Sequence, residues 1–137
     1  MKDTFDNILK AIGSARRIGV TSHARPDGDA VGSAVAMGMM IQEKGKEVAV
    51  INSDPVPESL KFLPGAELIK KPEKGGEFDL VIILDSADKV RVGKDFWEAV
   101  EGLKLLINID HHISNTCYAD VNYVDADSPA TGQIVYQ

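Results

Sequence analysis

The stretch FDLVIILD, residues 78–85, decides the fold. Its unbroken run of aliphatic, mostly β-branched residues is typical of a central strand in a parallel sheet that is covered on both faces. The run is far too short to span a bilayer. A second stretch of the same character, KLLINID at residues 104–110, follows it. The sequence therefore predicts two neighbouring central strands, and each of them ends in an aspartate.

Further elements alternate on either side of this pair. Phe5, Ile8, Leu9 and Ile12 recur at helical spacing. The predicted helices cover residues 3–15, 28–46 and 95–103, and the other predicted strands cover 17–22, 47–52 and, at an edge of the sheet, 119–125. This order predicts an α/β fold: an open, doubly wound, mainly parallel sheet of about five strands with helices on both faces.

Local signals predict where elements begin and end. Gly45 is a suitable residue to end the helix over 28–46, and proline and glycine make 53–77 a loop region. Ser128 and Pro129 predict the N-cap and first position of a last helix. Because that helix stops at Gln137 without a capping residue, we expect the chain to be a truncated piece of a longer protein.

Composition narrows the classes of function. The chain has 137 residues, which suggests one domain, and its 44% hydrophobic and 26% charged residues are ordinary for a globular protein. The single Cys117 excludes an internal disulfide, and this, with an N-terminus unlike a secretory signal, predicts a cytoplasmic protein. The net charge of −6 argues against a protein that coats phosphates with basic residues. Positive charge for a phosphate ester would have to be local, as divalent metal ions provide.

Potential metal ligands follow three of the predicted strands. They are His23, Asp27 and Asp29 after the first strand, Asp85 after 78–84, and Asp110, His111 and His112 after 104–109. Each group alone has a simpler interpretation: turn or N-cap residues for the aspartates and a solvated turn for the histidines. Ligands of parallel sheets bind beyond the carboxyl ends of the strands, where all three groups meet. Together they favour a site for Mn, Zn, Fe or Co.

These residues also carry a family resemblance. HARPDGDAVGS (23–33), Asp85 and DHHISN (110–115) resemble the first three motifs of the DHH phosphoesterase family. The middle stretch DPVPESLKFLPGAELI (54–69) is most similar to its nanoRNase branch, the oligoribonuclease and 3′-phosphoadenosine-5′-phosphate phosphatase proteins.

The resemblance implies a role for each matching residue. His23 and Asp27 would hold one metal, Asp29 and His111 the other, and Asp85 would bridge both. Asp110 would orient a neighbouring histidine. The residues expected to face the substrate phosphate are His112, Arg25, Ser114 and Asn115. The metals would be two Mn²⁺ ions, and the ligand set also permits Mg²⁺, Co²⁺ or Zn²⁺.

The implied activity is hydrolysis of short oligoribonucleotides to mononucleotides, and of 3′-phosphoadenosine-5′-phosphate, by a hydroxide that bridges two ions roughly 3.5–4 Å apart. Alternatives are another activity of the family, namely cyclic-dinucleotide cleavage, pyrophosphate hydrolysis or single-strand exonuclease activity, or a non-catalytic metal- or nucleotide-binding fragment. No membrane partner is expected, and the resemblance allows a homodimer of the full-length protein.

The resemblance also predicts what the chain lacks. The fourth motif of the family, a further aspartate, should lie beyond SPATGQIVYQ (128–137). We therefore expect residues 1–137 to be a DHH catalytic domain truncated before that motif, without the DHH-associated substrate domain.

Overall fold

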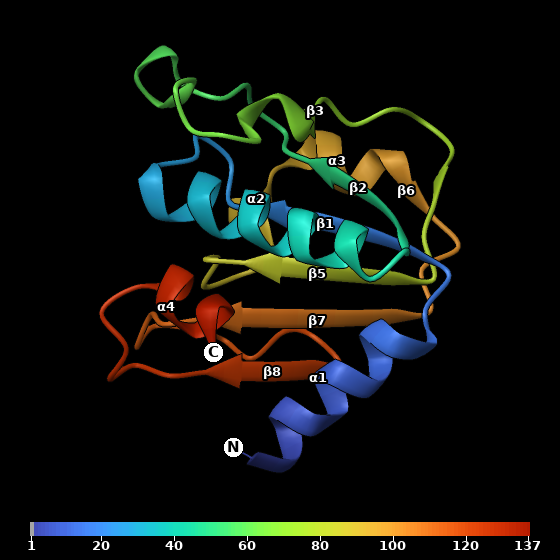
Figure 1. The fold of residues 1–137 in the computed structure, drawn as a ribbon, viewed down its shortest axis with the longest axis vertical. Helices are drawn as coiled ribbons and strands as arrows, with labels where there is room; N and C mark the ends of the chain where they lie inside the picture. The colour runs from blue at the N-terminus through green and yellow to red at the C-terminus, as the bar shows by residue number, and fades with distance from the viewer. Residues whose placement is uncertain (1) are drawn as a thin grey trace.

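A six-stranded sheet forms the centre of the molecule. The computed structural model describes residues 2–137. The strand order is β3-β2-β1-β5-β7-β8, and every neighbouring pair is parallel (Figure 1). In this order the strands are Ile69–Lys70, Glu47–Ile51, Arg17–Ser22, Leu80–Leu84, Leu105–Asp110 and Val121–Val124. The predicted parallel sheet is confirmed with all five expected strands. The sixth, β3, is a two-residue edge strand inside the predicted loop region.

Helices cover both faces of the sheet, as predicted. Helices α1 (Lys2–Ser14), α2 (Gly28–Glu43) and α4 (Thr131–Tyr136) lie over one face (Figure 1). Their apolar side chains join those of the strands in a core that includes Ile12, Ile41 and Ile134. The other face carries α3 (Lys94–Ala99) and the short 3₁₀ helix η3 (Val90–Val92).

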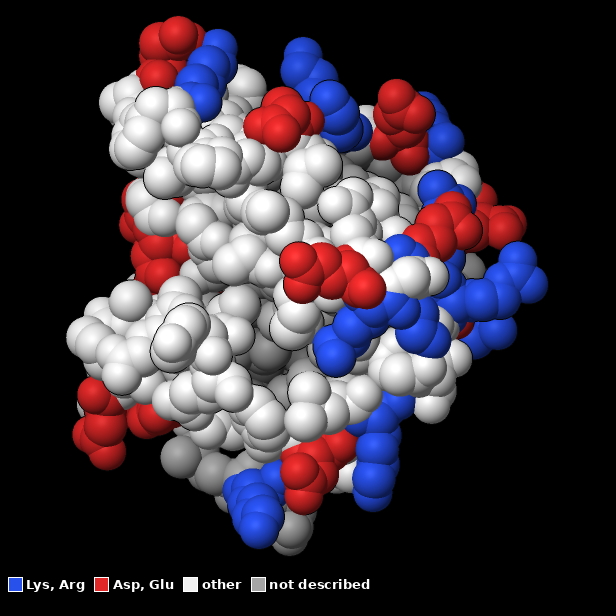
Figure 2. All heavy atoms as spheres, viewed as in Figure 1, with Lys and Arg blue, Asp and Glu red and all other residues white. Residues whose placement is uncertain are grey.

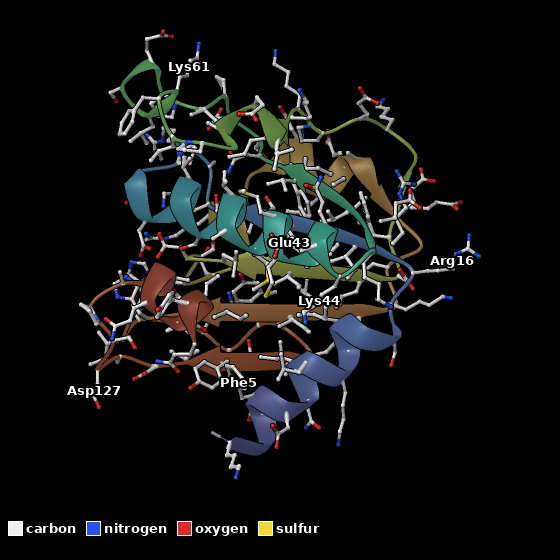
Figure 3. The ribbon with its side chains drawn as sticks, in the orientation of Figure 1. Phe5, Arg16, Glu43, Lys44, Lys61 and Asp127 are labelled. Carbon is white, nitrogen blue, oxygen red and sulfur yellow. The ribbon has the colours of Figure 1, made fainter. Side chains whose placement is uncertain are left out.

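Helix α1 is amphipathic, but fewer of its apolar residues are buried than the sequence pattern suggests. Ile8 and Ile12 are buried, whereas Leu9 remains 47% exposed. Phe5 packs edge-on against Tyr123 of β8, with ring centroids 5.9 Å apart (Figure 3). The helix therefore covers the β8 edge of the sheet.

Two predicted boundaries are wrong. The helix expected over 95–103 ends at Ala99, because Val100–Glu101 forms strand β6 and pairs with β4 (Gly76–Glu77). The last helix begins at Thr131 rather than at Pro129, and the hydroxyl of Ser128 donates to Asp125 instead of capping a helix.

The end of α2 agrees with its sequence signal. Gly45 adopts a φ of +72°, a conformation that glycine reaches without steric cost. The N–H groups of Gly45 and Lys46 donate to Gln42 and Ile41, which satisfies the last carbonyls of the helix.

Strand register aligns the expected functional residues. Ser22 pairs with Leu84, and Leu84 pairs with Ile109. The residues that follow these three positions are His23, Asp85 and Asp110, so the three enter the same edge of the sheet side by side. Among residues 2–137, no helix is both long enough and apolar enough to cross a membrane.

Candidate metal centre

His23 lies between two carboxylates. Its Nε2 atom is 3.6 Å from Oδ1 of Asp27 and 3.6 Å from Oδ2 of Asp85. The other ring nitrogen, Nδ1, is 2.7 Å from the carbonyl oxygen of Ala24. That contact requires a proton on Nδ1, so Nε2 is the nitrogen that faces the two carboxylates and would bind a metal ion.

His111 repeats this arrangement on the other side of Asp85. Its Nε2 is 3.5 Å from Oδ1 of Asp85 and 3.6 Å from Oδ2 of Asp29. Its Nδ1 lies 3.2 Å from the carbonyl oxygen of Ser128. Each histidine is thus fixed by a backbone carbonyl and directs Nε2 to a carboxylate pair, as metal-binding histidines do.

Asp85 is the shared member of the two groups. Its side chain is only 2% exposed, and its φ of +57° turns the chain sharply at the end of β5. Oδ2 faces His23, whereas Oδ1 faces His111 and accepts a 3.0 Å hydrogen bond from the Thr131 hydroxyl. A carboxylate this deeply buried is costly unless cations or donors surround it.

Asp27 and Asp29 also have structural duties. Asp27 is the N-cap of α2, and its Oδ1 accepts the Ala30 N–H at 3.0 Å. Asp29 accepts the N–H groups of Thr131 and Gly132 at 2.8 Å each, so it caps α4 from another helix. The N-cap interpretation and the metal interpretation of these residues are therefore compatible.

His112 competes with Asp29 for a place in the second group. Potential ligand atoms of Asp85, His111 and His112 lie within 4.8 Å of one another. However, Nδ1 of His112 is only 2.7 Å from Oδ1 of Asp110, against 3.8 Å from Oδ1 of Asp85. This nitrogen already has a close partner, but both oxygens of Asp29 also accept backbone N–H groups at 2.8 Å, so Asp29 as the third ligand stays a prediction.

A buried polar network holds His112. Asp110 is fully buried and uses Oδ1 for His112 and Oδ2 for the Asn115 amide, which donates at 2.7 Å. The same amide donates to Oδ1 of Asn108 at 2.7 Å. The histidine oriented by Asp110 is therefore His112, and its Nε2 remains available.

The pKa values reflect this crowding of charges. The Asp85 carboxylate raises the pKa of His23 to about 9 against the opposing effect of burial, and the Ala24 carbonyl and Asp27 add to the rise. At 3.6 Å, the Asp85 contact is an ion pair rather than a short hydrogen bond. Burial alone would raise the pKa of Asp29, but its amide and hydroxyl donors outweigh burial and lower it.

An open cleft of about 820 Å³ lies over the first group. The residues that line it are His23, Ala24, Arg25, Asp27, Asp85, Ala87, Val90, Arg91 and His112. Arg25 and His112 thus reach the cleft expected to hold a phosphate. Ser114 is exposed outside its lining. The amide of Asn115 donates to Asp110 and Asn108. These contacts do not favour its expected contact with the substrate phosphate, which stays a prediction.

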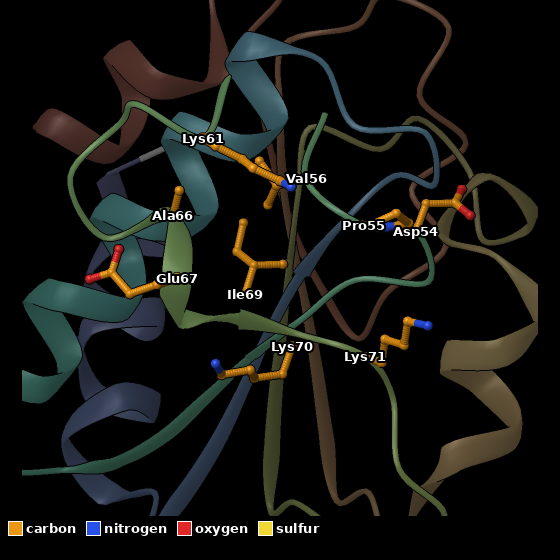
Figure 4. A pocket seen from close by; sticks show the side chains of 9 residues that line it. All are labelled: Asp54, Pro55, Val56, Lys61, Ala66, Glu67, Ile69, Lys70 and Lys71. Carbon is orange, nitrogen blue, oxygen red and sulfur yellow. The ribbon is translucent and has the colours of Figure 1, made fainter. Parts of the chain in front are cut away.

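Two residues at the centre had no sequence signal of their own. Thr131 reaches Asp85 from a distant segment, and Arg91 enters the cleft from a turn on the far face of the sheet. A second hollow, lined by Asp54 and Lys71 among others, lies beside β3 and contains none of the metal-ligand candidates (Figure 4).

Charge is unevenly distributed around the sheet. On the face shown in Figure 2, most Lys and Arg lie toward the side where the strands begin, whereas acidic residues lie on both sides. Asp127 and Arg16 mark these two sides in Figure 3. The donors at the strand ends, imidazole Nε2 atoms and carboxylate oxygens, fit a pair of divalent transition-metal ions.

Comparisons with known proteins match most of this chain. A family model described as the DHH family, N-terminal domain, matches residues 17–137. The bifunctional oligoribonuclease and PAP phosphatase NrnA of Thermus thermophilus is 37% identical over 129 residues, which are 93% of this chain and 37% of the relative. The probable bifunctional oligoribonuclease and PAP phosphatase NrnA of Streptococcus mutans is 32% identical over 131 residues, 96% of this chain and 41% of the relative. The chain thus spans about two-fifths of the length of these relatives.

A solved structure shares the fold. An exopolyphosphatase-related protein from Bacteroides fragilis superimposes with a TM-score of 0.85, over 99% of this chain and 42% of that chain. Its sequence identity is 23%, so this likeness concerns the architecture alone.

Proposed function

The chain belongs to the DHH family, and we propose that it is the metal-dependent catalytic part of a phosphoesterase that hydrolyses short oligoribonucleotides and 3′-phosphoadenosine-5′-phosphate. The names of the NrnA relatives support this choice of substrates. The position of Asp85 between two histidines is the observation that carries the proposal.

Two groups of ligands share Asp85 in this proposal. His23, Asp27 and Oδ2 of Asp85 would hold one ion, and Asp29, His111 and Oδ1 of Asp85 the other. Mn²⁺ suits this mixture of imidazole and carboxylate donors. When bound, such a pair of ions supplies an activated water and positive charge at the reacting phosphate.

In this proposal, residues of the chain position the substrate and accept or donate protons. Asp110 fixes the proton of His112 on Nδ1, so the neutral ring offers Nε2 to the cleft as an acceptor. When protonated, the same atom donates to a phosphate oxygen or to the leaving group. Arg25 adds a fixed positive charge at the cleft wall, where charge develops during phosphoryl transfer.

Hydrolysis by this chain tests the proposal. We expect the 137-residue protein with Mn²⁺ to release mononucleotides from a short oligoribonucleotide, and Asp85→Ala to abolish release while its circular dichroism spectrum is unchanged. A single-stranded DNA of the same sequence and a cyclic dinucleotide serve as alternative substrates. Undiminished activity of Asp85→Ala, or none in the unaltered chain, would contradict the proposal.

A further inference from the structure

Arg91 places a second positive charge in the cleft, on a different loop from Arg25. We propose that Arg91 binds a phosphate of the substrate that is not the one hydrolysed, so that the cleft favours substrates with two phosphate groups. This inference rests on the proposed function and narrows its substrate class.

The backbone around Arg91 is fixed to the metal-centre loop. Its carbonyl accepts the Ala24 N–H at 2.7 Å, directly after His23. Gly93, two residues on, has a φ of +99° and leaves no room for a side chain, because an added Cβ would lie 2.5 Å from Oγ of Ser53. The loop that carries Arg91 is therefore packed tightly against the loops that carry His23 and Ser53.

Asp88 orients the Arg91 side chain. Its Oδ1 accepts the Arg91 N–H at 2.9 Å, and its Oδ2 lies 3.3 Å from Nε of Arg91. The guanidinium group has five N–H donors, so this contact leaves its two terminal nitrogens free to bind an oxyanion. With the side chain 63% exposed, a ligand can reach them.

The position of Arg91 separates its role from that of Arg25. Arg25 belongs to the same loop as the ligand candidates His23 and Asp27, next to the reacting phosphate. Arg91 comes from η3, after the β5 strand, and lines the cleft together with Ala87 and Val90. Oligoribonucleotides and nucleoside bisphosphates both carry a phosphate that is retained beside the one that is attacked, and this second anion suits Arg91.

Phosphorus NMR titrations test the inference without requiring turnover. The probes are adenosine 5′-monophosphate and adenosine 3′,5′-bisphosphate, titrated into the 137-residue chain with diamagnetic Mg²⁺. Both phosphorus signals of the bisphosphate report binding and show that the probe stays intact. Arg91→Ala should raise the Kd of the bisphosphate about tenfold, which corresponds to one charge-assisted contact, and that of the monophosphate less than about twofold.

Matched variants separate charge, geometry and folding. Arg91→Lys keeps the charge without the two-pronged guanidinium group, so it should retain only part of the affinity for the bisphosphate. Asp88→Asn should weaken bisphosphate binding less than Arg91→Ala, because it only loosens the side chain. Lys94→Ala, at an exposed residue of α3 outside the cleft, should change neither Kd.

Each contrary outcome has its own meaning. If Arg91→Ala raised the Kd of both probes equally, Arg91 would contact the reacting phosphate. If it raised neither Kd, Arg91 would not contact the ligand. Either result overturns the inference. If the unaltered chain hydrolyses oligoribonucleotides while Arg91→Ala behaves as wild type, this inference fails and the proposed function stands. If the unaltered chain neither binds the bisphosphate nor hydrolyses an oligoribonucleotide, both fail.

Discussion

The carboxylate of Asp29 accepts a 2.8 Å hydrogen bond from the backbone N–H of Thr131, 102 residues further along the chain. The hydroxyl of the same Thr131 donates to Asp85. Helix α4 therefore begins on two carboxylates of the candidate metal centre.

Replacement of Asp29 by alanine should destabilise the metal-free chain. The change removes the acceptor for the Thr131 and Gly132 N–H groups at the start of α4. We expect the free energy of unfolding to fall by about 2 kcal/mol, as for a lost helix cap with charge-assisted hydrogen bonds. Urea denaturation at pH 7, followed by circular dichroism with a chelator present, measures it.

Asp127→Asn is the control for this change. Asp127 is an exposed acidic residue near α4, so its replacement removes one charge without removing the cap. Its stability should stay within about 0.5 kcal/mol of wild type. Equal losses in the two variants would show that net charge, rather than capping, explains the effect.

Replacement of His112 by alanine should impair turnover without removing a metal. Nδ1 of His112 is held by Asp110, and we assign the ring to the substrate. Turnover of an oligoribonucleotide should fall by about 10²–10³, while the number of bound Mn²⁺ ions per chain stays the same. Loss of one ion in His112→Ala, with none lost in Asp29→Ala, would make His112 the ligand instead.

Acid stability should depend on Asp79, far from the metal centre. The N–H groups of Arg16 and Arg17 donate to its carboxylate at 2.8 Å each, and chiefly the Arg16 contact lowers its pKa from 3.8. A lowered folded-state pKa gives stability that is present above pH 3.8 and is lost as the pH falls through the folded-state value.

Asp79→Asn should therefore cost up to about 1 kcal/mol at pH 7, after allowance for solvent screening, and nothing at the acid end of the titration. Asp95→Asn, at an exposed residue of α3, provides the reference curve of stability against pH. Denaturant midpoints from pH 7 down to the acid limit test this, and a deficit for Asp79→Asn that persists undiminished in acid would refute it.

The sequence predicts most of the sheet because its central strands have a strong local signature. FDLVIILD and KLLINID are rich in aliphatic residues, and both form buried strands that end beside each other. Once these strands are parallel, their register brings His23, Asp85 and Asp110 to one edge. The grouping of candidate ligands thus follows from local pattern and a general rule of parallel sheets.

Several contacts in the structure could not be predicted from local sequence patterns. Ser128 has the signature of an N-cap, but its hydroxyl bonds to Asp125, and Asp29 caps α4 from another helix. Val100 continues a helical pattern, but pairing with Gly76 makes it a strand. The hydrogen bond from the Asn115 amide to Asp110 also had no sequence signal, and the assignment of Asn115 to the substrate phosphate stays a prediction. For the starts of α4 and β6, hydrogen bonds from distant segments outweigh the local preference.

The number of Mn²⁺ ions bound by this chain tests the central claim most directly. Calorimetric titration, with metal counted after dialysis, should give two ions per wild-type chain, because the two ligand groups share Asp85. Asp85→Asn should raise the Kd of both Mn²⁺ ions, whereas His23→Ala should abolish the binding of only one. A wild-type chain that holds one ion or none, or an Asp85→Asn variant that still holds two as tightly as wild type, would contradict the shared-ligand account.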